Sequence, residues 1–478
     1  MHRLPVSIFL ACTFFNNVFS QNITKKLDQY LTDYYINKNV PSISTGLLHD
    51  GKIIWLAEKG YSDIENNVPA SKNTVYRIAS ISKIITAVAV IQLVEEGKIR
   101  LDDDVEKYIQ YPAKRWKFTV RQLLTHTAGI RNYRSTGEFE SKEYFRSTQE
   151  AINYLAKDSL EYEPGTKYFY TTLSYNFLAA IIENVSGLSF HDYIKKNILI
   201  SADMKSTYPD FQRSIIPNRA KGYDRNAYRQ VQNAALADLS IKIPGGGLLS
   251  TSEDLLKFSD NLLKGKLIKL TSLDSMIVPT KLKNGKTINY GLGVSFGIDE
   301  SGRKYISHSG TGTGFTSLLL IYPQEKTAVI HLMNIRDRNM GEPALDIAAI
   351  YFGREIKKPE KSLADFLLKI TLEYGIDSSL TALRKISSDT TGNFNKRLEE
   401  QITFGYDLIN IQSYPVAIQL FRMLTREFPN AADVFIGLGD AYLKDGNKGL
   451  ATKNFRLALR LQPLNSYAAE MLKKLSGI

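Results

Sequence analysis

The sequence predicts an α+β domain of layered architecture, followed by an all-α domain. Strand-like runs lie around residues 44–58 and return at 290–334. Residues 100–240 between them mix helical segments with turns rich in Pro and Gly. Strands from both ends of one segment can pair in a single mixed sheet, with the intervening helices packed against it. After residue 356 the pattern becomes helical and repeats every 34 residues.

Residues 1–20 are predicted to be a secretory signal peptide. A basic start precedes an apolar stretch at 4–15, and Ser20 ends a small-residue cleavage site. No later stretch reaches the ~20 apolar residues of a membrane span, so we expect a periplasmic or secreted protein without a transmembrane segment. Cys12 is the only cysteine, and cleavage would leave no disulfide. A lipoprotein signal around Cys12 is the alternative.

Local patterns predict the elements of the first domain, residues 22–355. We expect an amphipathic helix over 22–35, and Asp50-Gly51 between two apolar runs indicates a β-hairpin. The segment from Ser80 to Gly97 is apolar on nearly every face. That pattern predicts a helix buried in the core and ended by the glycine. Four strand-like runs then fill residues 290–334.

The chain is basic, but its charge is dispersed. The 61 Lys and Arg residues exceed the 49 Asp and Glu residues by 12. No run of five or six basic residues occurs, and acidic residues are interspersed throughout. This pattern is typical of a solvated surface, and we expect no nucleic-acid partner.

The segment after the first domain divides into a linker with packing helices, residues 356–394, and two repeats, residues 395–478. Four pairs of like residues are 34 positions apart: Gly405 and Gly439, Ala417 and Ala451, Phe421 and Phe455, Pro429 and Pro463. This period and these residue types fit the tetratricopeptide pattern. We expect the helices of 361–388 to complete the core of the repeats, and the repeats to hold a protein partner.

Ser80 and Lys83 are the candidate catalytic pair. At the start of a helix, a spacing of three places both side chains on one face, with Cβ atoms ~5–6 Å apart. A lysine buried beside an apolar helix has a lowered pKa and can accept the serine proton. The helix N-terminus adds positive potential at Ser80.

Two other serines are weaker candidates. Ser301 and Lys304 repeat the same spacing, but in a turn between strands, where both should be solvated. Ser295 stands in a Gly-x-Ser-x-Gly pattern, which needs a strand that turns sharply into a helix. Here a strand runs on into a turn and another strand, so we interpret Ser295 as a strand residue. The six histidines form no His-x-x-x-His pair, and we expect no metal or other cofactor.

Over roughly residues 25–350 the chain resembles the superfamily of class C β-lactamases and D-alanyl-D-alanine carboxypeptidases. The resemblance rests on five ordered motifs: Ser80-Ile-Ser-Lys83, residues 120–130, residues 163–170 with Tyr170, residues 244–254, and His308-Ser309-Gly310. It implies an antiparallel sheet flanked by helices, with a helical subdomain. His308 stands where class C β-lactamases have a lysine.

The resemblance also implies the roles of the site residues. Ser80 becomes acylated, while Lys83 and Tyr170 share proton transfer, the phenol being kept acidic by the nearby ammonium. Backbone N–H groups of Ser80 and Thr311 form the oxyanion hole. His308 orients Tyr170 or meets a substrate carboxylate. The implied substrate-binding residues are Thr172, His308, Ser309, Gly310 and Thr311.

Two further motif residues are expected to be structural. His126 follows an apolar helix and should make an internal hydrogen bond. Gly245–Gly247 should permit a close approach to the sheet.

One position departs from the family. Its second motif usually reads Tyr-x-Asn, whereas this chain has Thr172 in third place. This resembles the Tyr-Ser-Thr of mitochondrial serine β-lactamase-like proteins, and it predicts poor β-lactam turnover. We expect an exported serine hydrolase that acts on amide or ester bonds through an acyl-enzyme, a peptidase or a relative of β-lactamases. A carboxylesterase, or a penicillin-binding-like interaction module without activity, is the alternative.

Overall fold

The computed structural model describes residues 7–112, 116–337, 340–388, 393–463 and 465–476. The chain divides into two compact units. The first holds residues 1–224 and 233–356, and the second holds 225–232 and 357–478. Residues 1–6 of the predicted signal peptide lie outside the described part. The rest of that segment belongs to a helix, and its cleavage stays a prediction.

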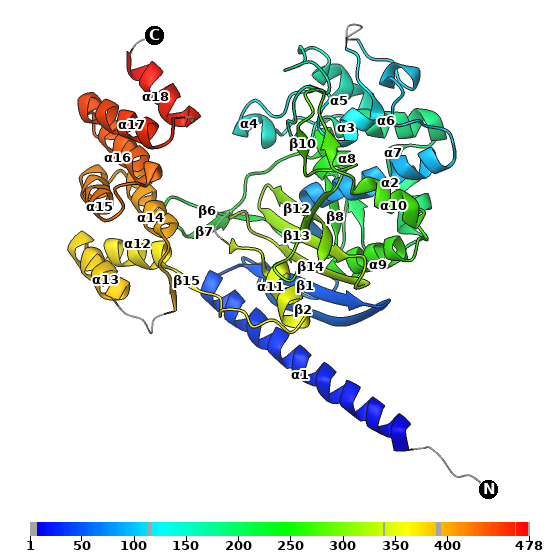
Figure 1. Cartoon of the computed structure of the whole chain (residues 1–478), viewed down its shortest axis with the longest axis horizontal. Coiled ribbons are helices and arrows are strands. Elements are labelled where there is room, and N and C mark those ends of the chain that lie inside the picture. Colours follow the sequence, from blue (N-terminus) through cyan, green and yellow to red (C-terminus); the bar gives the residue numbers. More distant parts are fainter. Residues whose placement is uncertain (1–6, 113–115, 338–339, 389–392, 464, 477–478) are drawn as a thin grey trace. The chain divides into compact units, whose positions relative to one another are not determined.

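The first unit is built on a seven-stranded sheet with the order β11-β12-β13-β14-β1-β2-β3 (Figure 1). Every neighbouring pair is antiparallel. The strands are β1 (Ser42–His49), β2 (Lys52–Asp63), β3 (Val68–Pro69), β11 (Ser295–Ile298), β12 (Lys304–Gly312), β13 (Phe315–Tyr322) and β14 (Thr327–Met333). The first and last long strands are neighbours, with Gly46 opposite Ile330. The predicted hairpin at Asp50-Gly51 and the closing of the sheet by both ends of the segment are confirmed, but the sheet is wholly antiparallel rather than mixed.

Helices cover both faces of this sheet. On one face α9 (Ser252–Leu263) lies so close to β1 that a Cβ on Gly46 would come within 2.8 Å of Leu256. On the other face, His331 of β14 accepts a hydrogen bond from the backbone N–H of Ala344. Ala344 belongs to α11 (Pro343–Tyr351). The opposed contacts of Gly46 and His331 follow from the two-residue period of strands.

The first helix, α1 (Ser7–Lys38), packs beside α11. Ile23, Leu27, Leu31 and Tyr34 are buried on one side of it, which confirms the amphipathic pattern. The Tyr30 hydroxyl donates a 2.6 Å hydrogen bond to Asp346 of α11. Among the described residues, no helix combines the length and the apolar character that crossing a membrane requires.

A helical subdomain surrounds α2 (Ser82–Glu95), which carries eleven buried residues. The predicted core helix is therefore confirmed, although its first turn, η1 (Ala79–Ile81), is a 3₁₀ helix that contains Ser80. The other helices of this unit are α3 (Val120–Leu124), α4 (Thr136–Phe139), α5 (Thr148–Leu155), α6 (Tyr175–Ser186), α7 (Phe190–Ile194), α8 (Ile243–Gly246) and α10 (Leu270–Met276). A small sheet joins β4 (Tyr76–Arg77), β8 (Leu248–Ser250) and β5 (Tyr208–Pro209).

The second unit is helical, as predicted. Its helices are α12 (Leu363–Tyr374), α13 (Ile376–Ser388), α14 (Leu398–Asn410), α15 (Tyr414–Glu427), α16 (Ala432–Lys444), α17 (Lys448–Leu461) and α18 (Ser466–Ser476). Gly405 packs against the ring of Phe421, and Gly439 packs in the same way against Phe455. The 34-residue period is thus repeated in the packing. Leu363 and Leu380, from α12 and α13, share a core with Phe404 and Phe421, which confirms that these helices complete it.

Candidate active site

Lys83 lies at the centre of a hydrogen-bond cluster at the start of α2. Its Nζ is 3.0 Å from the Ser80 hydroxyl oxygen, 3.1 Å from the Thr172 hydroxyl oxygen and 2.5 Å from the carbonyl oxygen of Gly245. The Lys83 side chain is fully buried. The predicted Ser-Lys pair is therefore brought together, with a precise set of partners.

Burial lowers the pKa of Lys83 well below its ordinary value of 10.5, and the nearby charge of Lys242 lowers it further. A neutral amine has two hydrogens and one lone pair. The carbonyl of Gly245 can only accept a hydrogen bond, and the hydroxyl of Thr172 can accept the second. The lone pair is then left for the Ser80 hydroxyl, which is the arrangement that a general base needs.

The backbone just before Ser80 is strained. Ala79 has φ of 45°, in the left-handed region that residues with a Cβ rarely adopt. Strain of this kind costs about 1–3 kcal/mol and persists only where the surroundings enforce it. Here β12 holds the conformation in place. Its Gly310 packs so closely against η1 that a Cβ on Gly310 would collide with the carbonyl oxygen of Ile78. This contact also sets Thr311 beside η1.

Tyr170 lies next to the Ser-Lys pair, with its ring centroid 4.8 Å from Lys83 Nζ. Burial raises the pKa of Tyr170 well above its ordinary value, and a hydrogen bond with Ser80 offsets only part of this effect. The expectation of a phenol kept acidic by an ammonium is therefore wrong. Lys83 is itself shifted toward the neutral form, so Tyr170 is a neutral phenol that can donate its proton.

In the 244–254 motif, Gly245 shapes the surroundings of Lys83 rather than a contact with the sheet. A Cβ on Gly245 would come within 2.6 Å of the backbone oxygen of Thr172 and within 2.9 Å of its methyl group. Gly247 instead approaches Ile243 of its own turn. The expected approach to the sheet is therefore corrected. The missing side chain of Gly245 lets its carbonyl reach Lys83.

Two histidines and a tyrosine form a hydrogen-bond relay behind the site. The Thr171 backbone N–H donates to His126 Nδ1 at 3.3 Å, so the proton of the neutral His126 ring lies on Nε2. His126 Nε2 is 3.2 Å from the Tyr290 hydroxyl, which lies 3.1 Å from His308 Nε2. His308 Nδ1 is 2.6 Å from the carbonyl oxygen of Ser309. Each link therefore has one consistent direction, from Thr171 to Ser309.

The relay keeps both histidines neutral. Burial and the nearby Lys83 lower the pKa of His308 to about 3, and burial lowers that of His126 well below its ordinary value. Both ring nitrogens of His308 are engaged by Tyr290 and Ser309. The internal hydrogen bond predicted for His126 is present.

The catalytic cleft has a volume of about 810 Å³. Its lining residues are Ser80, Asn132, Tyr133, Ser135, Thr136, Phe139, Tyr170, Thr172, Ser309, Thr311 and Arg336. The segment 132–139 thus forms one wall of the cleft. Of the predicted substrate-binding residues, Thr172, Ser309 and Thr311 line the cleft, Gly310 is packed beneath it, and His308 is buried.

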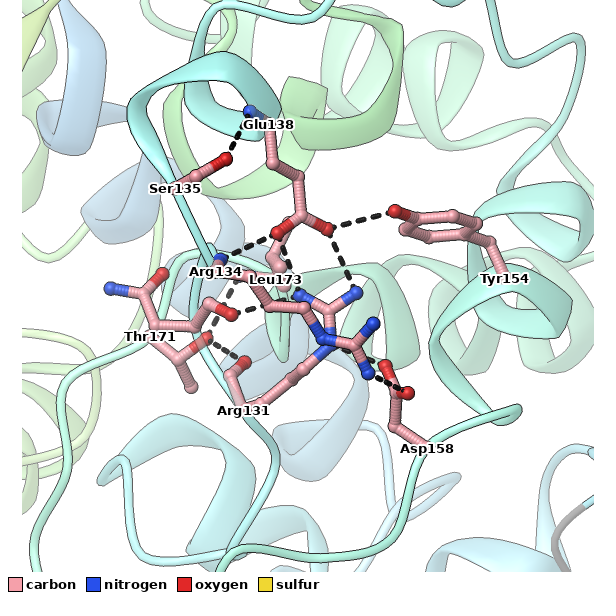
Figure 2. Close-up of polar contacts among 9 residues, drawn as sticks. Arg131, Arg134, Ser135, Glu138, Tyr154, Asp158, Thr171 and Leu173 are labelled. Carbon is pink, nitrogen blue, oxygen red and sulfur yellow. Dashed lines mark hydrogen bonds and ion pairs between the residues drawn. The ribbon is translucent and has the colours of Figure 1, made fainter. Parts of the chain in front are cut away.

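An ion-pair network holds that wall (Figure 2). The buried Arg131 guanidinium pairs with Glu138 at 2.8 Å and also with Asp158. Glu138 accepts further hydrogen bonds from the Tyr154 hydroxyl and the Arg134 backbone. The carbonyl of Arg131 accepts a 2.7 Å hydrogen bond from the hydroxyl of Thr171, and the backbone N–H of Thr171 donates to His126. The cleft wall and the relay are therefore joined at Thr171.

The rival serines lack such partners in the described structure. Ser295 begins β11 and pairs with Ser307 in the sheet, which confirms the strand interpretation. Ser301 is exposed in the turn before β12, and Lys304 is exposed at its start. Within the described ranges, no three His, Cys, Asp or Glu side chains lie close enough to hold a metal ion.

Comparison with known proteins agrees with this geometry. The Beta-lactamase family model matches residues 20–352. The chain belongs to the beta-lactamase family. Over 380 residues it is 30% identical to the human mitochondrial serine beta-lactamase-like protein LACTB, covering 60% of this chain and 69% of that protein. It is also 30% identical over 331 residues to a penicillin-binding protein of Bacillus subtilis, covering 65% of this chain and 72% of that protein.

Solved structures of other proteins share the fold of the first unit. The octameric penicillin-binding protein homologue of Pyrococcus abyssi has a TM-score of 0.60 and 26% identity, covering 73% of this chain and 81% of that one. The D-amino acid amidase of Ochrobactrum anthropi has a TM-score of 0.61 at 22% identity, covering 69% and 98%, which shows the shared fold. The predicted fold and superfamily are confirmed.

Beyond the motifs, this beta-lactamase-family site contains residues that the sequence analysis missed. Tyr290 joins the two histidines. Lys242 is buried, donates to the carbonyl of Phe139 and lies 4.2 Å from the centroid of its ring. Burial and the charge of Arg77 lower the pKa of Lys242 to about 7. The sequence signal that could have revealed Lys242 is its position in the apolar run that precedes Gly245–Gly247.

Proposed function

We propose that the protein is an exported serine hydrolase that cleaves small amides or esters through an acyl-enzyme on Ser80. The observation that carries this proposal is the buried Lys83, whose Nζ lies within hydrogen-bond distance of the Ser80 hydroxyl, the Thr172 hydroxyl and the Gly245 carbonyl. An inactive scaffold has no need of a buried lysine, because desolvating an ammonium is costly.

The proposed reaction begins with transfer of the Ser80 proton to Lys83 Nζ. The Ser80 oxygen bonds to the substrate carbonyl carbon, and the backbone N–H groups of Ser80 and Thr311 stabilise the oxyanion. Tyr170 gives its proton to the departing nitrogen or oxygen as the carbonyl–leaving-group bond breaks. The proton held by Lys83 then restores the phenol. Water attacks the acyl-enzyme by the same proton transfers in reverse and releases the acid and Ser80.

Labelling with a fluorophosphonate tests this assignment. The probe should form a covalent adduct on Ser80 that peptide mapping locates, and Ser80→Ala should abolish it. Ser295→Ala is the matched control and should label as the wild type does. An adduct on Ser295, or on no serine, would contradict the proposal.

The substrate is proposed to be a small ester or peptide-like amide rather than a β-lactam. Thr172 has one short hydroxyl, which accepts from Lys83 and cannot span the distance to a substrate carbonyl as well. An asparagine could accept from the lysine through its oxygen and still donate its amide hydrogens to a substrate carbonyl. A carboxylesterase is the second candidate, favoured by the same loss of an amide-binding group.

We expect Thr172→Asn to accelerate β-lactam acylation by roughly tenfold. The added hydrogen bond is worth about 0.5–1.5 kcal/mol, and the upper end of this range corresponds to about a tenfold change in rate. Ester hydrolysis should change less, because small esters lack the side-chain amide. Stopped-flow acylation by a chromogenic cephalosporin gives the measurement. Efficient cephalosporin turnover by the wild type would show that Thr172 does not limit it.

Export and partners are also proposals. The composition of residues 1–20 supports a signal peptide. The repeated Gly–Phe packing of the second unit supports tetratricopeptide-like repeats that hold a protein segment.

A further inference from the structure

A second cavity, of about 420 Å³, lies close to the catalytic cleft but has its own lining. We name it the Arg219 cavity. Its lining residues are Arg77, Gln212, Arg219, Ala220, Lys221, Gly222, Asn233, Ala234, Ala235, Leu236, Ala237, Thr313 and Phe315. Three of these side chains are cationic, and none is a carboxylate. The remaining wall is mostly apolar.

A narrow neck separates the Arg219 cavity from the cleft. Arg77 and Thr313 line both the cavity and this neck, while Ser80 and Thr172 line both the neck and the cleft. The neck has a volume of about 20 Å³, which holds about one water molecule. A substrate chain cannot pass through it. The cavity is therefore a separate site.

The charge of the cavity is not balanced by its nearest acid. Asp210 is buried and pairs with Arg77 at 2.6 Å and, more weakly, with Arg219 at 3.5 Å. One carboxylate between two guanidinium groups leaves one net positive charge. Lys221, also in the lining, pairs with Glu65 and Asp63 outside the lining.

Two polar atoms of the lining have no hydrogen-bond partner among the described residues. One is the hydroxyl oxygen of Thr313, a residue that is 1% exposed. The other is Nε of Arg219, whose Nη2 already donates to the carbonyls of Phe211 and Ser214. Leaving such groups unpaired is costly, and buried polar groups in native proteins are nearly always satisfied. Both atoms are buried, so a ligand in the cavity contacts the part of the Arg219 side chain that is exposed, 25% of it, rather than these two atoms.

We propose that the Arg219 cavity binds a carboxylate that carries a short apolar chain. The carboxylate pairs with the partly exposed Arg219 side chain, and its charge offsets the surplus of the two guanidinium groups. The chain lies against Ala234, Ala235 and Phe315. This binding site is additional to the catalytic cleft and does not depend on the reaction proposed for Ser80.

Isothermal titration calorimetry of the full chain with sodium hexanoate tests the proposal, with sodium acetate and inorganic phosphate as probes at matched ionic strength. Hexanoate has four methylene groups more than acetate, and burial of even two of them should make it bind at least about tenfold more tightly. Phosphate, which lacks the apolar chain, should bind no better than acetate. Equal affinity for all three anions would overturn the proposal.

Two variants locate the binding. Arg219→Met should weaken hexanoate binding at least tenfold, because it removes the donor and the surplus charge. Ala235→Phe should do the same by filling the cavity, and it leaves every charge and hydrogen bond in place, so it tests the site even if Arg219→Met folds poorly. The matched control is Arg121→Met, which removes an exposed arginine paired with Asp102. Hexanoate affinity that is unchanged in Ala235→Phe would overturn the proposal.

Discussion

Replacement of Lys83 with methionine is expected to lower kcat/KM for a small ester by about 10²–10⁴-fold, the usual contribution of a general base. Methionine keeps the volume of the buried chain but has no lone pair that could take the Ser80 proton. Because burial lowers the pKa of Lys83, kcat/KM of the wild type should rise with pH and reach its plateau well below 10.5. Steady-state hydrolysis of a chromogenic ester across this range gives both results.

Lys83→Arg separates the base from the positive charge. An arginine stays protonated at every accessible pH, so this variant should remain inactive across the whole profile. Activity of Lys83→Arg comparable to the wild type would show that the cation, and not the base, matters.

The lowered pKa of Lys83 also makes a prediction for stability. Between the folded pKa of Lys83 and 10.5, the unfolded wild type binds a proton that the folded protein does not. The free energy of unfolding of the wild type, relative to Lys83→Met, should therefore rise with pH and become constant above 10.5. Urea denaturation of both proteins measures this difference. A difference independent of pH would mean that Lys83 is not buried in its neutral form.

Arg131→Met should lower the free energy of unfolding by about 3–5 kcal/mol, because it leaves buried carboxylates without their cation. The Arg131 side chain is 5% exposed, and those of Glu138 and Asp158 are 12% and 17% exposed. Urea denaturation at neutral pH measures the loss. Since segment 132–139 lines the cleft, KM should rise as well.

A matched surface pair is the control for Arg131. Arg121 and Asp102 are 44% and 74% exposed, so Arg121→Met should cost no more than about 1 kcal/mol. Burial alone would raise the pKa of Glu138, but Arg131, the Arg134 backbone and Tyr154 lower it overall. Its contribution is present above 4.5 and is lost as pH falls through the folded pKa. The difference between wild type and Arg131→Met should therefore shrink in acid, and equal losses in both variants would contradict the buried network.

The sequence predicted the parts of the site that depend on local geometry. Ser80 and Lys83 are three residues apart at the start of α2, and the apolar run after them makes burial of the lysine evident. The hairpin at Asp50-Gly51 and the repeat of Gly405 and Gly439 are likewise encoded in short patterns or a fixed period.

The other features of the site are the relay through Tyr290, the buried Lys242 and the pKa of Tyr170. They depend on contacts between segments that are distant in the sequence. His126 and Tyr290 are 164 residues apart, and no period or spacing relates them. Lys242 reaches the carbonyl of Phe139, 103 residues earlier in the chain. The acidity of Tyr170 was predicted in the wrong direction because it depends on how deeply the ring is buried, which a motif does not specify.

The hydrogen-bond relay through Tyr290 has a fixed direction, and this direction prevents it from conducting protons. Its two ends are backbone groups with fixed roles, because the N–H of Thr171 can only donate and the carbonyl of Ser309 can only accept. The polarity of the whole chain therefore cannot reverse, and adding a proton to either ring would set one donor against another. No net proton can travel along this path. In the reaction proposed above, Lys83 and Tyr170 therefore exchange protons only with each other, Ser80, water and the substrate.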